Sequence, residues 1–223
     1  MCIRDSIYFA RLDSKIDNIS VYEARIRGGA TLAKTYPVDA DLVCGVPDSG
    51  LASAKGYSEE SGIPFGLAFH KNSYVGRTFI KPTQKERESS VKIKLSVLES
   101  VVKGKRIVLV DDSIVRGTTI SNLITMLRKA GATEVHVRIS SPPFLYPCYF
   151  GTDVPSNKQL IASSHSTEEI RQQIGADSLG YMPIEELQNM VGDLPICRAC
   201  FDSHYPMEVP KQDISCLLYT SDA

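Results

Sequence analysis

Residues 108–119, VLVDDSIVRGTT, place acidic, hydroxyl-bearing and glycine residues in an order that suits a sugar phosphate. The carboxylates of Asp111 and Asp112 can accept hydrogen bonds from sugar hydroxyls and can bind Mg2+, a hard cation that takes oxygen ligands. The backbone N–H groups that follow can receive a phosphate, and Gly117 lets the backbone approach it closely. Two acids after an apolar strand are also common at a solvated strand end, so these residues alone leave both interpretations open.

The patterns on either side place this stretch between a strand and a helix. Residues 107–110 are apolar and mostly β-branched, as in a buried strand, and helical spacing follows Thr119. Similar alternation along the chain predicts an α/β fold with a mostly parallel sheet flanked by helices. The expected strands are residues 41–46, 65–69, 106–111 and 134–139. The expected helices run from the capping box of Ser20 and Glu23 to about residue 36, over 50–60, and over 118–130.

After residue 143 the pattern becomes helical. Capping-box spacing, Pro183 and the glycines that follow predict three helices, which begin near Ser156, Ser166 and Pro183. The two ends of the chain lack this periodicity and resemble translated sequencing adaptors, so we expect them to be non-native. The resulting division of the chain is a core at 7–143, a C-terminal helical extension at 144–212, and foreign ends at 1–6 and 213–223.

Composition limits the function classes. The chain has 223 residues, of which 43% are hydrophobic and 23% charged, as in an ordinary globular protein. Its net charge of -1 gives no overall attraction to nucleic acid or to an anionic membrane. No apolar run is long enough to span a membrane and the N-terminus is charged, so we expect a cytoplasmic protein. Six cysteines in such a chain favour metal binding or chemistry over disulfides.

Four stretches in order resemble one enzyme family. VLVDDSIVRGTT looks like the phosphoribosyl-pyrophosphate (PRPP) motif of type I phosphoribosyltransferases, and DDSIVRGTT is similar in particular to the amidophosphoribosyltransferases. GVPDSG at 45–50 resembles the family's pyrophosphate loop, and KNSYVGRTFIKP at 71–82 its mobile catalytic loop. LIASSHSTEEIRQQIGAD at 160–177 lies outside the shared core and is similar to this family only. The resemblance runs from about Ile7 to Gln212.

The resemblance implies a type I phosphoribosyltransferase fold and a specific reaction. The family transfers ammonia to PRPP, giving 5-phosphoribosylamine and pyrophosphate, at the committed step of de novo purine synthesis. The intact enzymes take ammonia from glutamine in an N-terminal glutaminase domain, which this chain lacks. The chain alone would use free ammonia. The resemblance further implies purine nucleotides as feedback inhibitors, a homo-oligomer, and no nucleic-acid or membrane partner.

The resemblance also implies residue roles. Asp111 and Asp112 would hold the ribose hydroxyls and, with Ser49, the Mg2+. Asp48 lies in the pyrophosphate loop and would also contact substrate. Lys71, Tyr74 and Arg77 would close over the pyrophosphate as catalytic residues, although Ser73 replaces an arginine that the family usually carries there. The residues that would cradle the 5-phosphate are Ser113, Ile114, Val115, Arg116, Gly117, Thr118 and Thr119.

Three cysteines form a second signal. Cys197 and Cys200 make a Cys-x-x-Cys, which by itself indicates zinc, a redox pair or simple packing. The resemblance instead implies a [4Fe-4S] cluster bound by these two residues and Cys148. Cys2 stands where the family's remaining ligand would fall, but its neighbours look foreign, so its role stays open. Cys44, on a buried strand, is predicted to be a core residue.

Two other functions remain open. One is a phosphoribosyltransferase that joins a purine or pyrimidine base to the sugar, which needs neither the cysteines nor the extension. The other is a non-catalytic PRPP-sensing module. A sensor can lose the cations of the catalytic loop, yet Lys71 and Arg77 are present here.

Overall fold

The computed structural model describes residues 1–72, 95–149 and 160–209. The main sheet of this part of the chain is parallel throughout, with Val43 opposite Val108 and Leu109 opposite Val137. Its strands, in spatial order, are β3 (Leu42–Gly45), β6 (Arg106–Asp111), β7 (Glu134–Ile139) and β8 (Ser178–Tyr181). The predicted strands at 41–46, 106–111 and 134–139 are therefore confirmed.

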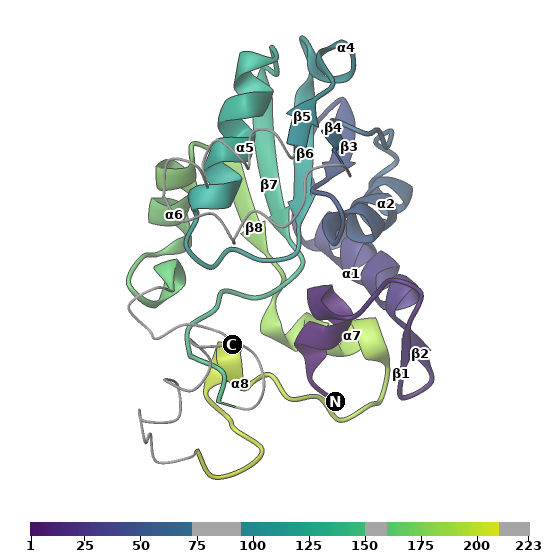
Figure 1. The fold of residues 1–223 in the computed structure, drawn as a ribbon, viewed down its shortest axis with the longest axis vertical. Helices are drawn as coiled ribbons and strands as arrows, with labels where there is room; N and C mark the ends of the chain where they lie inside the picture. Colours follow the sequence, from purple (N-terminus) through teal and green to yellow (C-terminus); the bar gives the residue numbers. More distant parts are fainter. Residues whose placement is uncertain (73–94, 150–159, 210–223) are drawn as a thin grey trace, which may run out of the picture.

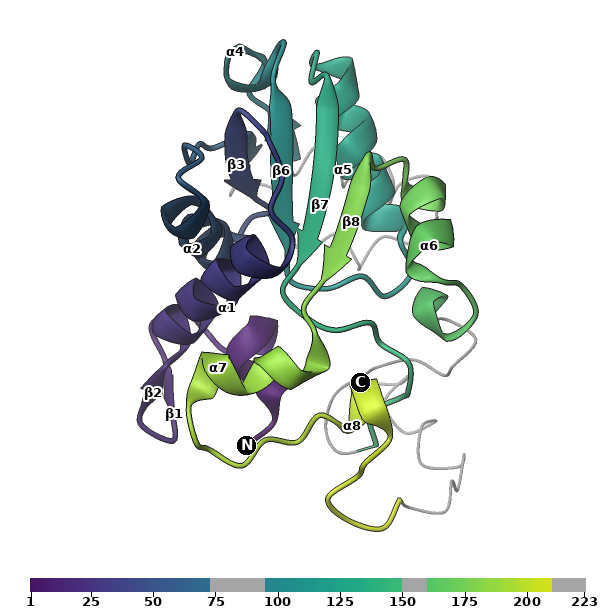
Figure 2. The ribbon, with the colours of Figure 1, turned by 180° about the vertical axis from the view of Figure 1, so that it is seen from behind.

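Helices cover both faces of this sheet (Figures 1 and 2). The helices α1 (Val21–Thr35) and α2 (Gly50–Ser61) lie on one face, and α5 (Thr118–Lys129) with α6 (Thr167–Ile174) lies on the other. Their ends follow the predicted signals, since Ser20 accepts a hydrogen bond from the Glu23 N–H and Ser166 forms a full capping box with Glu169. The capping box expected at Ser156 falls on residues outside the described ranges.

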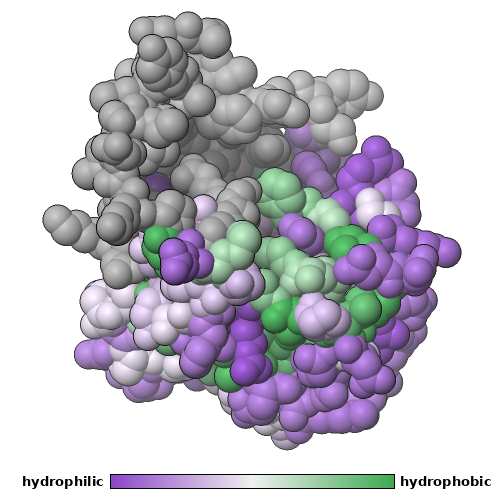
Figure 3. Space-filling model, turned by 90° about the horizontal axis from the view of Figure 1, so that it is seen from below, coloured by the Kyte–Doolittle hydropathy of each residue, from purple (hydrophilic) through white to green (hydrophobic). Residues whose placement is uncertain are grey.

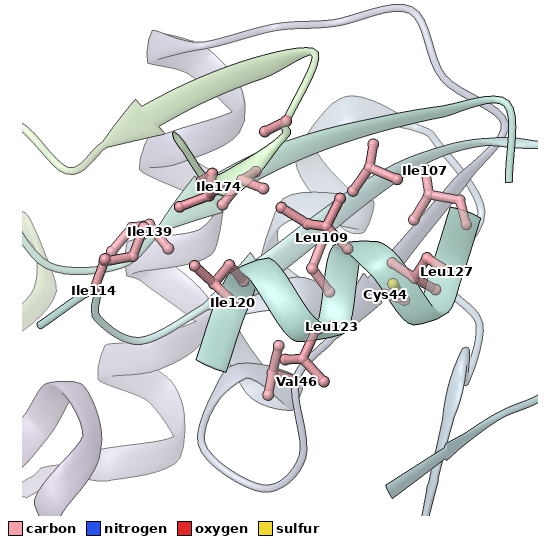
Figure 4. Close-up of a cluster of buried hydrophobic side chains, with 14 of the residues drawn as sticks. Cys44, Val46, Ile107, Leu109, Ile114, Ile120, Leu123, Leu127, Ile139 and Ile174 are labelled. Atoms are coloured by element: carbon pink, nitrogen blue, oxygen red, sulfur yellow. The ribbon is translucent and has the colours of Figure 1, made fainter. Parts of the chain in front are cut away.

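Alternate residues of β6 supply the two halves of the core. Ile107 and Leu109 face α5 and α6, where they pack with Leu123 and Leu127 (Figure 4). Val108 and Val110 point the other way, into a cluster formed with α1, α2 and the C-terminal helices. Because both faces of the strand are buried, its sequence is a continuous apolar run rather than an alternating one. Packing on both faces therefore holds β6 in place, and Asp111 is the last residue of this strand.

Two predictions of secondary structure need correction. The expected strand at 65–69 is wrong: Phe65 makes only an isolated bridge to Val43, and the strand β4 is Phe69–Lys71. It pairs antiparallel with β5 (Leu95–Val97), which precedes α4 (Glu99–Val102); neither was predicted. The pattern after residue 143 also missed β8, which joins the main sheet beside β7.

The N-terminal residues pack against the core. The helix η1 (Asp5–Phe9) buries Ile7, and Ile3 before it has no exposed surface. Arg25 of α1 donates hydrogen bonds to the carbonyls of Ser6, at 3.0 Å, and Ala10, at 2.9 Å. Whatever its origin, the segment expected to be foreign is thus an integral part of this structure.

The remaining short elements lie at the lower end of the molecule and beside α6 (Figure 1). Seen from below, hydrophobic residues gather on part of the lower end, surrounded by hydrophilic ones (Figure 3). No helix within the described residues is long and apolar enough to cross a membrane. The short elements are β1 (Lys15–Ile16), β2 (Ile19–Ser20), η4 (Ile161–Ser163), η5 (Ile184–Glu186), α7 (Leu187–Val191) and α8 (Ala199–Asp202).

Gly28 and Gly29 are adjacent in α1, but a side chain at the two positions would meet different neighbours. A Cβ on Gly29 would lie 1.9 Å from the carbonyl oxygen of Ser53 in α2, and one on Gly56 would lie 2.0 Å from the carbonyl oxygen of Ile26. The backbones of α1 and α2 therefore touch. A Cβ on Gly28 would meet only the flexible end of Met190, at 3.1 Å.

We expect Gly29→Ala to lower the free energy of unfolding by about 1–3 kcal/mol, because α1 and α2 must separate to admit the methyl group. Gly28→Ala is the matched control. Its better helix propensity, worth about 1 kcal/mol, offsets the shift of Met190, so its stability should stay within about 1 kcal/mol of the parent. Chemical denaturation of the three proteins measures both values; equal stability of the two variants would contradict the close contact.

Candidate functional site

The candidate site lies at the carboxyl end of β6, where the chain turns into α5. In open α/β sheets this edge is the usual place for a ligand. A pocket of about 670 Å³ opens there. It gathers the whole predicted sugar-phosphate motif together with Ser49, and its lining residues are Val46, Ser49, Asp111, Asp112, Ser113, Ile114, Val115, Arg116, Gly117, Thr118, Thr119 and Ile120.

Asp112 joins two of the turns that border this pocket. Its carboxylate accepts hydrogen bonds from the hydroxyls of Ser49, just before α2, and of Ser113. Ser49 and Asp112 are 63 residues apart in the sequence and come from different βα turns. The pocket therefore presents a half-buried carboxylate with hydroxyls on both of its oxygens, which suits a cation or the hydroxyls of a sugar.

Asp111 is more deeply placed. Its side chain accepts a hydrogen bond of 2.8 Å from the N–H of Asp112, and only 8% of the residue is exposed. Burial, and then the neighbouring charge of Asp112, raises the pKa of the Asp111 carboxyl well above its ordinary value. The Ser140 N–H holds the Asp111 carbonyl at 2.9 Å, and the Ser141 N–H holds the Asp112 carbonyl at 3.0 Å. The end of β7 thus fixes the backbone of both acids.

The turn between β6 and α5 is shaped to receive an anion. Gly117, the residue before α5, has φ of 79°, a left-handed conformation that favours glycine. The turn leads into the N-terminus of α5, where free N–H groups and the helix dipole attract negative charge. Thr118 and Thr119 expose hydroxyl-bearing side chains beside it. Ile161 supports the turn from below, since its N–H donates to the Val115 carbonyl at 2.9 Å.

The predicted pyrophosphate-binding residues are only partly placed. Lys71, the last residue of β4, forms an ion pair with Asp48. Neither residue lines the pocket, so in this state the lysine ammonium is neutralised beside the site. The peptide bond between Pro47 and Asp48 is cis. Tyr74 and Arg77 lie outside the described residues.

The cysteines form a second group, at the lower end of the molecule. The Cys197 N–H donates to the Met1 carbonyl at 2.7 Å and the Ile3 N–H to the Cys197 carbonyl at 3.3 Å, so residues 1–3 run beside Cys197 and Cys2 pairs with it as an isolated bridge. Burial raises the pKa of the Cys200 thiol to about 12. Arg4 opposes that rise, whereas Cys2, Cys148 and Cys197 are close enough to add to it. The four candidate thiols are therefore neighbours, and the structure brings Cys2 among them.

A single metal ion has no ready site in the described part of the chain. Within residues 1–72, 95–149 and 160–209, no three His, Cys, Asp or Glu side chains converge closely enough to hold one. Cys44 stands apart from the other thiols, because it is fully buried in β3, where burial raises its pKa to about 12. Its prediction as a core residue is confirmed.

Sequence reasoning missed several residues that support the site. Val46 and Ile120 form apolar parts of the pocket wall, and Ser140 and Ser141 anchor the acids. The two serines had a usable signal, because they directly follow a predicted strand at the sheet edge where ligands bind. No sequence signal pointed to Ile161, because it contacts the turn only after the extension has folded against the core.

We expect Asp111→Asn to stabilise the unliganded protein at neutral pH. An unfolded aspartate titrates near pH 3.8, whereas the buried carboxyl titrates higher, so the wild type loses stability as the pH rises from about 4 through the raised pKa. The gain should therefore be largest at neutral pH and should vanish near pH 4, where the carboxyl is protonated in both states. Thermal unfolding across pH measures it.

The control for this change is Asp193→Asn, which removes the same charge at an exposed residue. Asp111→Asn should differ from this variant by gaining stability relative to wild type as the pH rises. A gain for Asp111→Asn that is the same at pH 4 and pH 7 would refute the raised pKa.

Known proteins similar to this chain agree with the geometry. The model of the phosphoribosyl transferase domain family matches residues 17–140. The chain is 55% identical over 213 residues to the amidophosphoribosyltransferase of Methanocaldococcus jannaschii and 53% identical over 220 residues to that of Bacillus subtilis. These matches cover 96% of this chain but 45% and 46% of the relatives, so the chain spans about half of their length.

A solved structure shows the same likeness. The glutamine PRPP amidotransferase from B. subtilis, complexed with ADP and GMP, matches with a TM-score of 0.86 and 52% identity. The match covers 95% of this chain and 48% of that one. A TM-score of 0.86 over 95% of this chain means that the two backbones share one fold. The chain therefore has the type I phosphoribosyltransferase fold and belongs to the phosphoribosyl transferase domain family.

Proposed function

We propose that this chain is the PRPP-binding part of an amidophosphoribosyltransferase, which replaces the pyrophosphate of PRPP by ammonia and forms 5-phosphoribosylamine. The observation that carries the proposal is the convergence of Asp111, Asp112, Ser49 and the turn before α5 on one pocket. The identity of 50% or more to amidophosphoribosyltransferases along nearly the whole chain supports this reaction over others of the family.

The pocket sets the orientation of the substrate. The 5-phosphate would lie on the turn at 113–119, where backbone N–H groups and the hydroxyls of Thr118 and Thr119 can donate to it. The ribose hydroxyls would then reach Asp111 and Asp112. Because the charged form of Asp111 is disfavoured in the unliganded protein, hydrogen bonds from two hydroxyls would recover part of that cost.

The donor atoms also fit Mg2+. The carboxylates of Asp111 and Asp112 and the hydroxyl of Ser49 offer only oxygen, the ligand type that this cation prefers. When bound, Mg2+ would neutralise charge on the pyrophosphate. Each oxygen of Asp112 accepts one serine hydrogen bond and has a second lone pair, so the carboxylate can bind the cation while it keeps both of these bonds.

The leaving group would be received by the pyrophosphate loop and by the segment that follows β4. Lys71 now pairs with Asp48, and we infer that it exchanges this carboxylate for pyrophosphate when substrate binds. A cation that meets the charge growing on the leaving group lowers the barrier. Tyr74 and Arg77 would close over the same group and exclude water, which would otherwise hydrolyse the activated sugar.

The contact between the extension and the phosphate turn favours this reaction over a base-using phosphoribosyltransferase or a sensing module. Ile161 begins η4 and holds the Val115 carbonyl, and its Cδ1 lies 3.1 Å from where a Cβ of Gly117 would stand. The stretch that resembles amidophosphoribosyltransferases alone therefore packs against the turn that lines the pocket.

We further propose that Cys2, Cys148, Cys197 and Cys200 hold a [4Fe-4S] cluster. Thiolate is the ligand that such clusters require, and the thiols of Cys2, Cys148 and Cys197 all act electrostatically on that of Cys200. Each thiolate of a cluster binds a different iron, so these sulfurs need not converge as they would around one ion. The cluster would tie residues 1–3, the segment before residue 149 and α8 together.

The partners follow from the same proposal. An N-terminal glutaminase domain would supply ammonia, and the length of the relatives leaves room for one. Purine nucleotides would inhibit, as ADP and GMP are bound in the B. subtilis structure. Homo-oligomer formation remains a prediction from the resemblance.

The purified chain should release pyrophosphate from PRPP in the presence of Mg2+ and ammonium, but not with adenine, guanine or orotate in place of ammonium. Asp112→Asn should reduce the rate by about 100-fold or more, since it weakens electrostatic contacts at the reacting sugar and the metal. Asp193→Asn should keep the wild-type rate. Turnover of a base without turnover of ammonium would overturn the assignment.

After anaerobic reconstitution with ferrous iron and sulfide, wild type should bind about four irons per chain. Cys2→Ala, Cys148→Ala and Cys200→Ala should each bind far less, because a ligand is lost. Cys44→Ala is the matched control and should keep the wild-type iron content. Full iron content in Cys2→Ala would remove that residue from the ligand set.

A further inference from the structure

Arg4 is a buried cation without a buried anion. It precedes η1, only 1% of it is exposed, and it is among the largest fully buried side chains. No ion pair joins it to an acidic residue within the described ranges. Because burying an unpaired charge is costly, such a residue calls for a negatively charged partner.

The hydrogen bonds of Arg4 leave one side of the guanidinium open. Nε donates to the Tyr8 hydroxyl at 3.1 Å, and Nη2 donates to the same oxygen. The rings of Tyr8 and Phe144 lie 5.4 Å and 5.2 Å from Cζ, so the guanidinium is enclosed by aromatic faces. Nη1 is buried and has no hydrogen-bond partner among the described residues. One donor of a buried cation is thus unused.

The guanidinium of Arg4 lies near the cysteine group. Arg4 follows Cys2 by two residues, and it interacts electrostatically with Cys200 and Cys148. Phe144 packs on Phe201 with ring centroids 5.0 Å apart, and the N–H groups of Leu145 and Tyr146 both donate to the Cys200 carbonyl at 3.1 Å. Arg4 therefore packs against the segments that carry Cys148 and Cys200, and Cys2 is two residues before it.

We propose that Arg4 is the positioned counter-charge of the [4Fe-4S] cluster, with Nη1 donating a hydrogen bond to a sulfur of the bound cluster. This inference rests on the cluster proposed above. Four thiolates give the cluster a net negative charge, and the potential of such clusters depends on nearby charge and on hydrogen bonds to sulfur. A fixed cation favours the more reduced state, so it makes the cluster harder to oxidise.

The test compares charge variants of Arg4 in the full chain. Arg4→Met keeps an unbranched side chain and removes the charge, whereas Arg4→Lys keeps the charge. We expect Arg4→Met to have a lower midpoint potential in an anaerobic spectroscopic titration. Its visible absorption should also bleach several-fold faster in air, because dioxygen removes an electron from the cluster more readily. Arg4→Lys should restore most of the potential.

The matched control is Arg138→Met. Arg138 is also buried, with 3% exposed, and lies 5.9 Å from the Tyr36 ring, but its hydrogen bonds are to Tyr36, Val137 and Ser178 rather than near the cysteines. This variant should lose stability and keep the potential and bleaching rate of wild type. If Arg4→Met does not fold, Arg4→Gln takes its place with the same expected direction.

The outcomes separate the role of Arg4 from the presence of the cluster. A wild-type protein that binds no iron overturns the cluster and Arg4's role together. A wild-type protein with a full cluster, whose potential and bleaching rate are unchanged in Arg4→Met or Arg4→Gln, overturns only the role of Arg4. Equal shifts in the Arg4 and Arg138 variants would also overturn it, because they would reflect general loosening.

Discussion

Parallel strands end at the same edge of a sheet, and the candidate site depends on this constraint. The turn after β3 supplies Ser49, the end of β6 supplies Asp111 and Asp112, and the end of β7 supplies the N–H groups that hold both acids. None of these residues is near the others in the sequence except within the motif itself. The hydrogen bond from Ser49 to Asp112 joins the turns that follow β3 and β6 at the candidate site.

The candidate site contains several carboxylates close together, and neighbouring groups offset their negative charge. The chain as a whole is nearly neutral, so it has no long-range attraction for an anionic substrate. Burial raises the pKa of the Asp111 carboxyl, two hydroxyls donate hydrogen bonds to Asp112, and the ammonium of Lys71 pairs with Asp48. In the proposed complex, Lys71 would exchange Asp48 for the ligand, whereas each oxygen of Asp112 could accept a further bond while keeping its serine hydrogen bond.

Local signals predicted the βα units that build the site, and they failed where tertiary partners decide. β6, α5 and β7 were predicted because a β-branched run, a turn and amphipathic spacing are each encoded within a few residues. β4 was misplaced because a short strand is defined by its pairing, here with β5. β8 was missed because glycine is a poor strand residue, and Gly180 is glycine because the ring of Tyr36 leaves no room for a Cβ.

The residues of the candidate site divide in the same way. Those inside a contiguous motif were predicted and lie together, whereas Ser140, Ser141 and Ile161 reach the site only through the fold. Arg4 was overlooked because it lies in the segment 1–6 that was expected to be foreign, and no sequence pattern distinguishes a buried arginine from an exposed one. The roles of the individual side chains in binding and turnover stay predictions.

The place of β8 at the edge of the main sheet bears on where this protein can be divided. A core that ended at residue 143 would lose that strand and leave β7, a six-residue strand with five buried positions, as an open edge. Unprotected apolar edges pair readily with other chains. A chain cut after residue 143 would therefore tend to self-associate, because the core and the extension are joined by the hydrogen bonds between β7 and β8.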